Sequence, residues 1–317
     1  MKPKQVARRH HYIPQFYLKR WTSNGLLVEY SKPYGNTIKV QRRYTKQVGW
    51  IDRLYTLDGV SEERSAIYEE HFLSPVDSRA ADVLAKMERK VRDITPAERV
   101  AWAQFILSLV LRHPENVTSV KERLAESLLI VDDVSQRRWR KARRPQDPNL
   151  LSEALRQEAE ANPAEVSRRG LQLMFEMMAN ERIGTHLINM HWGSIPLPPG
   201  IPALLTSDRP VHWFGALRDN NCHIMMPVGP KRIFWAANTY EIADIIRSTN
   251  PFRLHAFMNS STVRRAVKSV YGMSDTHISY VQDFMGVDPE VTIADMIIHK
   301  LPASRIRREK RKLAVAQ

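Results

Sequence analysis

The pattern of apolar and polar positions changes along this chain, and each change predicts a different kind of structure. Near the start, residues 26–30 and 37–40 are rich in aliphatic, β-branched and aromatic side chains. The segment 31–36 between them contains Pro, Gly and Asn, which are typical turn residues. These runs predict a β-hairpin. From about residue 62 to residue 191 apolar positions instead recur at helical spacing.

Three helix starts, two within this middle block and one beyond it, have the residues that typically cap a helix N-terminus. Thr95-Pro96-Ala97-Glu98 is a capping box with proline at the first helical position, and Asn162-Pro163 and Asn250-Pro251 repeat the arrangement with asparagine as the cap. The helix that starts at Pro96 is apolar nearly all round over residues 105–111, which predicts a buried central helix. We expect it to end before Pro114, because the residue that precedes a proline disfavours the helical conformation.

Beyond the proline-rich segment 196–202, which interrupts regular structure, strand-like runs return. We expect strands at 203–206, 211–214, 223–227 and 232–236, followed by helices at 240–247, 252–271 and 293–301. Strands and helices in separate blocks predict an α+β fold: an N-terminal β-hairpin region and a later small antiparallel sheet around a mainly helical core. The predicted organisation is one domain over residues 1–298, strand-rich at 203–237, and a flexible basic tail at 299–317.

Composition narrows the class of protein. With 317 residues, 43% of them hydrophobic, the chain can bury a sizeable core. Its one cysteine, Cys222, excludes an intrachain disulfide and a multi-cysteine zinc site, which suits a reducing cytoplasm. No signal-peptide pattern opens the chain, and the most apolar run, residues 105–111, is too short to cross a bilayer. We therefore expect a cytoplasmic protein without a membrane partner.

The net charge of +14 is concentrated in three places. Residues 1–46 carry +10, residues 137–144 carry +6 and residues 299–317 carry +6, which leaves −8 for the remainder. Concentrated positive charge favours a polyanionic partner, so nucleic acid is the predicted partner, with DNA and RNA equally open. The alternative is that these stretches are solvated basic faces and a disordered end.

The densest candidate for chemistry is the N-terminal motif, residues 10–21, which places two adjacent histidines and four aromatic rings around Pro14. His10 and His11 would face opposite sides of a strand, whereas a loop would let both converge. Imidazole titrates near neutrality, so either one can serve as a general base or a metal ligand. The alternative is that the histidines and aromatic rings of the motif only pack and cap backbone groups.

A second candidate is Ser207-Asp208, at the end of a predicted strand. Asp208 can orient a histidine, ligate a metal or act as a base; alternatively, its carboxylate accepts backbone N–H bonds in a turn. Arg112, at the end of the buried helix, can bind a phosphate or lie against helix-terminal carbonyls. Asn259 can line the wall of a site. Nucleotide- and dinucleotide-binding glycine motifs, His-Glu-x-x-His and EF-hand patterns are absent from the sequence.

Several of these elements together resemble the bacterial domain-of-unknown-function family 4238. The resemblance rests on the motif of residues 10–18, on Thr206-Ser207-Asp208-Arg209-Pro210-Val211, on Pro227-Val228-Gly229-Pro230, and on Asn259 with Arg264-Arg265-Ala266-Val267. It spans about residues 10–272. Members of the family usually carry Asn in the third place of the Ser-Asp-x-Pro element, where this chain has Arg209. The resemblance implies candidate positions and the extent of the fold, but no reaction.

The leading functional hypothesis is a nucleic-acid-directed phosphodiester hydrolase. His10 or His11 would be the base or a metal ligand, and Asp208 would orient it or share the metal; the cofactor is left open, with a divalent metal as one candidate. Substrate contacts would come from Gln15, Tyr17, Arg112, Ser207, Arg209 and Asn259, and Trp21 and Trp139 would stack on bases. The alternatives are a non-catalytic nucleic-acid-binding or interaction protein and a small-molecule hydrolase. The hydrolase hypothesis requires the N-terminal motif to fold back onto the segment that carries Asp208.

Overall fold

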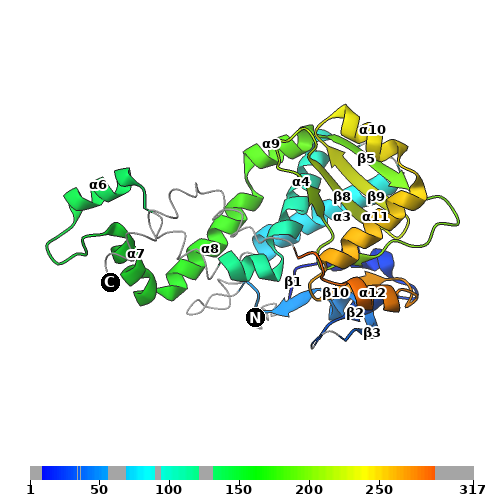
Figure 1. Cartoon of the computed structure of the whole chain (residues 1–317), viewed down its shortest axis with the longest axis horizontal. Helices are drawn as coiled ribbons and strands as arrows, with labels where there is room; N and C mark the ends of the chain where they lie inside the picture. The colour runs from blue at the N-terminus through cyan, green and yellow to red at the C-terminus, as the bar shows by residue number, and fades with distance from the viewer. Residues whose placement is uncertain are drawn as a thin grey trace, which may run out of the picture. The chain divides into compact units, whose positions relative to one another are not determined.

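The computed structural model describes residues 9–33, 35, 37–55, 69–89, 94–120 and 131–289 (Figure 1). These residues form helices and small antiparallel sheets, as the α+β prediction requires. The helices are α1 (Gln15–Leu18), η1 (Lys19–Trp21), η2 (Thr45–Gln47), η3 (Glu69–Leu73), α3 (Ser74–Arg89), α4 (Pro96–Leu111), α6 (Asp133–Ala142), α7 (Leu151–Ala161), α8 (Pro163–Met178), α9 (Glu181–Asn189), α10 (Tyr240–Ser248), α11 (Pro251–Arg265) and α12 (Ile278–Phe284). The strands are β1 (Arg9–His11), β2 (Leu26–Ser31), β3 (Lys39–Tyr44), β4 (Trp50–Asp52), β5 (His191–Pro196), β6 (Thr206–Ser207), β7 (His212–Phe214), β8 (His223–Gly229), β9 (Arg232–Ala237) and β10 (Ser269–Gly272).

The chain divides into two compact units. The first comprises Met1–Leu54, Ala66–His113 and Met178–Glu290; the second comprises Tyr55–Ser65, Pro114–Met177 and Val291–Gln317. The expected helix at 293–301 and the expected tail at 299–317 lie outside the described residues. The predicted domain boundary at residue 298 therefore stays a prediction. No helix among the described residues has both the length and the apolar character needed to cross a membrane.

The predicted hairpin is confirmed as β2 and β3, which pair antiparallel from Leu26↔Tyr44 to Ser31↔Lys39. These two strands belong to a four-stranded sheet in the order β3-β2-β10-β6. Its inner strand β10 corrects the prediction of one helix over 252–271, because α11 ends at Arg265 and residues 269–272 form a strand. The run Ser269-Val270-Tyr271 has the β-branched and aromatic character that suits an inner strand.

The later sheet has the order β5-β9-β8-β7, and β8 and β9 form the expected hairpin with an irregularity between Pro227 and Gly229. Its first strand, β5, starts at His191, whereas the sequence predicted that strands return only after the proline-rich break at 196–202. Figure 1 shows α10 and α11 beside this sheet, where Met225 and Trp235 pack against Ile246 and Met258 in one buried cluster. The expected segment at 203–206 contributes β6 to the other sheet instead.

Helix α4 is the buried central helix that its sequence predicts. The capping box is formed: the Glu98 N–H donates to the Thr95 hydroxyl, and the Glu98 carboxylate accepts the Thr95 N–H at 2.9 Å. Nine of its residues are buried, among them Trp102, whose ring meets Phe234 of β9 edge-on at 5.7 Å. The helix ends at Leu111, before the Arg112-His113-Pro114 segment, as expected.

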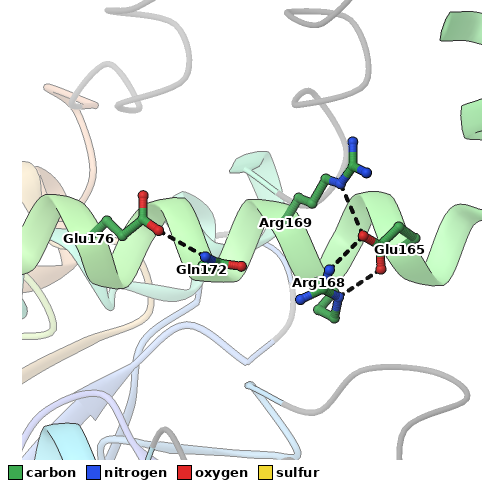
Figure 2. Close-up of polar contacts among 5 residues, drawn as sticks. All are labelled: Glu165, Arg168, Arg169, Gln172 and Glu176. Carbon is green, nitrogen blue, oxygen red and sulfur yellow. Dashed lines mark hydrogen bonds and ion pairs between the residues drawn. The ribbon is translucent and has the colours of Figure 1, made fainter.

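In the second unit, α8 has the amphipathic pattern of a surface helix. Leu171, Met174 and Phe175 are buried, so the methionine-containing face of this helix belongs to the core. On the exposed face, Glu165 accepts hydrogen bonds from Arg168 and Arg169, and Gln172 donates to Glu176 (Figure 2). These contacts three and four residues apart stabilise the helix locally.

Two glycines provide a matched test of the packing between β5 and β9. A Cβ on Gly193 would lie 2.3 Å from the Trp235 ring, whereas a Cβ on Gly184, in α9, would meet nothing within 4 Å. We expect Gly193→Ala to lower the free energy of unfolding by more than about 2 kcal/mol, because the strand must move away from the indole. We expect Gly184→Ala to raise it by about 0.5–1 kcal/mol, because alanine favours the helix. Urea titrations of both variants would measure this, and equal stabilities would contradict the packing.

Candidate functional site

The N-terminal motif forms a strand followed by a short helix. β1 pairs with β4 in a two-stranded sheet, Pro14 precedes α1 in an extended conformation, and α1 continues into η1. The backbone N–H groups of Tyr12 and Ile13 both donate to the Gly49 carbonyl. Gly49 has φ +66° and lies against Ile13, so a side chain there would be strained as well as crowded. The turn before β4 therefore fixes where β1 ends and α1 begins.

The motif folds back onto the segment that precedes Asp208, as the hydrolase hypothesis requires. The Tyr17 hydroxyl lies 2.7 Å from the Thr206 hydroxyl and donates to the Pro227 carbonyl at 2.7 Å. The Trp21 indole N–H donates to the Leu204 carbonyl at 2.7 Å. Both rings are completely buried, so these side chains hold the two parts of the chain together. The prediction that Trp21 stacks on bases is wrong, because no part of its ring reaches the surface.

Asp208 is buried, with 1% of its surface exposed, and its carboxylate is held by backbone donors. One oxygen accepts the Val267 N–H at 3.0 Å; the other accepts the N–H groups of Lys268 and, at 3.1 Å, Ser269. Burial raises the pKa of this carboxyl to about 6, although the three hydrogen bonds and the charge of Arg209 lower it. Of the two roles predicted for Asp208, this geometry corresponds to the acceptor of backbone N–H bonds. The donors come from the segment after α11 rather than from the neighbourhood of Pro210.

Three other predicted site residues lie around Asp208 and also make structural contacts. The Ser207 hydroxyl accepts the Arg209 N–H at 3.1 Å, and Arg209 itself is buried. The Asn259 side chain accepts the Leu205 N–H at 2.9 Å and lies 3.1 Å from the His255 ring nitrogen. Buried amide and hydroxyl groups that satisfy strand ends in this way fix the position of β6. Gln15, on α1, is half-buried.

Within the motif, Tyr12 is affected by the charge of Asp208. Burial, followed by the charges of Asp208 and Glu29, raises the pKa of the Tyr12 hydroxyl. The same two carboxylates raise the pKa of Tyr271 on β10, which is also completely buried. The Tyr12 ring meets the His113 ring edge-on at 5.9 Å. The sequence identified the motif and Asp208, but it gave no sign that tyrosines would link them.

The two histidines face different surroundings, as alternation along a strand predicts. His10 is buried and is the cross-strand neighbour of Ile51, whereas His11 is half-buried. The Nε2 atom of His11 is buried and makes no hydrogen bond in the structure as described. Burial, then the charges of Arg112, Arg9 and His10, lowers the pKa of His11 to about 4. At neutral pH its imidazole is therefore uncharged and has a ring nitrogen without a partner.

Arg112 lies near His11, whose pKa its charge lowers, and its side chain is 0% exposed. Its Nη1 atom donates to both carboxylate oxygens of Asp77, at 3.0 and 3.1 Å. Its Nε and Nη2 atoms are buried and make no hydrogen bond within the described part of the chain. Burial raises the pKa of nearby Glu69 to about 7, against the opposing effect of the Arg112 charge. Arg112, Asp77, Glu69 and His11 are called the Arg112 cluster below.

By their contacts the site residues form two groups. These groups adjoin each other, because the charge of Asp208 acts on Tyr12, next to His11, and that of Arg209 acts on His113, next to Arg112. Tyr17, Ser207, Asp208, Arg209 and Asn259 lie at β6 and its neighbours, whereas His11 and Arg112 belong to the Arg112 cluster. Sequence reasoning missed Glu69 and Asp77, because neither belongs to a recognisable motif and only the packing of α3 against α4 brings them to Arg112. Among the described residues no three His, Cys, Asp or Glu side chains are grouped so that they would hold a metal ion.

The hydrogen bonds of Asp208 predict a large structural effect of its removal. Asparagine has one side-chain oxygen, and its amide would face N–H donors, so Asp208→Asn leaves buried backbone groups unsatisfied. We expect the free energy of unfolding at pH 7.5 to fall by at least about 2 kcal/mol. Asp219→Asn is the matched control, because Asp219 accepts a single N–H bond, from Ala216, in an exposed turn. An Asp208→Asn protein as stable as the wild type would contradict the structural role and favour a reactive carboxylate.

Comparison with known proteins gives one match. A family model described as a protein of unknown function (DUF4238) matches residues 9–276, which includes every element of both groups of site residues. No match was found among curated proteins or among solved structures. The matched region extends from β1 through β10, so it covers the N-terminal motif, the Ser207-Asp208 segment and the Arg112 cluster. The chain therefore belongs to the DUF4238 family, whose description names no function.

Proposed function

We propose that this protein binds nucleic acid through a surface made by β3, η2 and β4 together with Arg9. The observation that carries the proposal is a pair of cation–aromatic contacts on this part of the chain. The residues concerned are Arg9, Arg42, Tyr44, Lys46 and Trp50, and they are called the β3–β4 surface below. Proteins that bind single strands combine cations, which neutralise phosphates, with aromatic rings on which bases stack.

The first contact lies at the end of β3, which is the edge strand of its sheet (Figure 1). Tyr44 is 52% exposed, and the Lys46 ammonium lies 5.8 Å from the centre of its ring. Arg42 is also exposed and points to the same side of the strand as Tyr44, because alternate residues share a face. An exposed tyrosine between two cations can stack on a base while the cations contact the adjoining phosphates.

The second contact lies six residues further on, in the two-stranded sheet. The Arg9 guanidinium lies over the Trp50 ring at 4.5 Å, and Arg9 is exposed while Trp50 is half-buried. Residues 39–53 contain five Lys or Arg and one Asp, so the local charge is strongly positive. Lys and Arg on an edge strand also protect it against pairing with other chains. That role would explain the charges of β3, but not the position of a cation beside each of the two aromatic rings.

The other basic stretch within the described residues is α6 and the turn after it. Arg137, Arg138 and Arg140 are exposed, as expected for a charged helix face. Trp139, however, is half-buried, and its indole N–H donates to the Pro148 carbonyl at 2.9 Å, so this ring serves the local turn. The β3–β4 surface therefore provides the better match to single-strand recognition.

Binding of fluorescent single-stranded DNA and RNA, followed by anisotropy between 50 and 300 mM salt, tests the proposal. We expect Arg42→Glu/Lys46→Glu to weaken binding at least about tenfold and to reduce the salt slope by about 1.4, because two phosphate contacts with a single strand are lost. Tyr44→Ala should weaken binding with little change of slope, because stacking is insensitive to salt. Arg218→Glu/Arg253→Glu changes exposed arginines elsewhere by the same charge and should bind normally. Equal losses in both double variants would mean that only net charge matters.

A phosphodiester hydrolase is the second candidate function, and the neutral, half-buried His11 supports it. In this structure the corresponding His/Asp pair would lack a free carboxylate, because Asp208 is occupied by backbone donors. His11 would then act as a general base without Asp208, by accepting a proton at its unpartnered Nε2 atom.

Cleavage assays on the same oligonucleotides separate the hydrolase from the binding protein. If the hydrolase proposal is right, cleavage in the presence of one of Mg²⁺, Mn²⁺ or Zn²⁺, or in EDTA, should fall at least about 100-fold in His11→Gln, since a general base contributes on that order. His186→Gln is the control, because His186 lies 2.9 Å from the Asn238 side chain. Salt-dependent binding without cleavage under any of these conditions would leave the binding function and exclude the hydrolase.

A further inference from the structure

The Arg112 cluster has a property that nucleic-acid binding at the β3–β4 surface does not use. A guanidinium group has two edges that can hold a carboxylate or phosphate with two parallel hydrogen bonds. Asp77 bonds only to Nη1 of Arg112. The side edge formed by Nε and Nη2 stays without a hydrogen bond to any described residue, although both atoms are buried. This edge can donate two parallel hydrogen bonds to two oxygens of one carboxylate or phosphate group.

Leaving two donors of a buried cation unsatisfied is costly. Each buried donor without a partner costs about 1–3 kcal/mol, and more when it is charged. Native proteins satisfy nearly all such groups with protein, water or ligand. The neighbouring groups show the same feature, because Nε2 of His11 and Oε2 of Glu69 are also buried without a hydrogen bond in the described chain. Three side chains from β1, η3 and the end of α4 therefore hold unused polar atoms in one neighbourhood.

The charges of the cluster are matched to one further anion. Arg112 lowers the pKa of both His11 and Glu69, which places its charge close to each of them. Burial keeps the pKa of Glu69 near 7, so this carboxyl can be protonated at neutral pH and can donate to an anion instead of repelling it. His11 is neutral and can donate or accept through Nε2. The cluster thus provides one permanently charged group, Arg112, and two groups, Glu69 and His11, that can donate a hydrogen bond to an anion.

The members of the cluster differ in exposure. Arg112 is fully enclosed, but Asp77 keeps 22% of its side chain exposed, and Glu69 and His11 are half-buried. A nucleic-acid backbone cannot reach a completely enclosed arginine. A small molecule with a single carboxylate or phosphate group suits an enclosed guanidinium edge better, because its two oxygens match the two donors.

We propose that the Arg112 cluster is a binding site for the carboxylate or phosphate group of a small molecule, with the Nε–Nη2 edge of Arg112 as its main anchor. Glu69 and His11 complete the site from the partly exposed side. The site adjoins the β3–β4 surface, because His11 is the cross-strand neighbour of Trp50 and Arg9 lowers the pKa of His11, but its anchor Arg112 is not part of that surface. It also differs from the hydrolase role of His11, because it requires binding and no bond cleavage.

Isothermal titration of the full chain with inorganic phosphate and, separately, acetate tests this site at constant ionic strength set with chloride. We expect one of the two anions to bind with a stoichiometry of one, and the one that binds identifies the group. Arg112→Lys keeps a cation for Asp77 but has no fork, so it should weaken binding at least about tenfold. Glu69→Gln removes a negative charge and should strengthen binding about threefold or more at pH 8. Arg218→Glu/Arg253→Glu should bind as the wild type does.

Three results would overturn the proposal. The first is that neither anion binds beyond the chloride control, which would mean that water satisfies the guanidinium edge. The second is binding that Arg112→Lys leaves unchanged, which would place the anion on the basic surface. The third result applies if Arg112→Lys does not fold. In that case, an affinity that Glu69→Gln leaves unchanged would overturn the proposal. Loss of oligonucleotide binding in the assays above would not affect any of these outcomes.

Discussion

The carboxylate of Asp208 is the interaction on which the arrangement of this protein most depends. It receives three backbone N–H bonds from Val267, Lys268 and Ser269, the segment where α11 ends and β10 begins. Those bonds place β10 between β2 and β6, and β2 belongs to the N-terminal hairpin. A buried anion is tolerated only when such donors replace water, and the backbone supplies three of them here, with the charge of Arg209 as a further stabilising effect. One side chain therefore joins three distant parts of the chain.

The N-terminal motif makes the complementary connection from the other direction. The Tyr17 hydroxyl donates to the Pro227 carbonyl of β8 and lies 2.7 Å from the Thr206 hydroxyl of β6, so the short α1–η1 segment is fixed to both four-stranded sheets. Phe16 packs against Phe105 of α4 at 5.3 Å, and Tyr12 meets His113 just beyond that helix. A motif that packs on one helix and bonds to two sheets tolerates little change, which gives its aromatic density a structural reason. This packing does not explain why the motif contains two histidines.

The role of Arg112 depends on its burial. At the surface, an arginine after a helix would be one more cation in a strongly basic protein. Enclosed beside Asp77 and Glu69, it becomes a fixed charge whose free donors need a partner, and it changes the titration of the groups around it. Perturbed carboxyl and imidazole groups gathered at one cation are typical of sites that bind or react with ligands. The exposed cations of β3 and η2, by contrast, are suited to a partner that needs only charge and stacking.

The sequence by itself determined the α+β class, the hairpin, the capped start and the burial of α4, and the importance of the motif and of Asp208. These follow from local rules, because periodicity, caps and turn residues act over a few positions. It did not determine that residues 269–272 leave the helical pattern to form a strand, or that β5 begins before the proline-rich segment. Nor did it determine that His11 lies near Arg112 while backbone donors occupy the Asp208 carboxylate. Each of these depends on partners far away in sequence: β2 and β6 for β10, β9 for β5, and Asp77 and Glu69 for Arg112. Only the tertiary structure decides such pairings, because burial and hydrogen-bond partners exist only once the chain has folded.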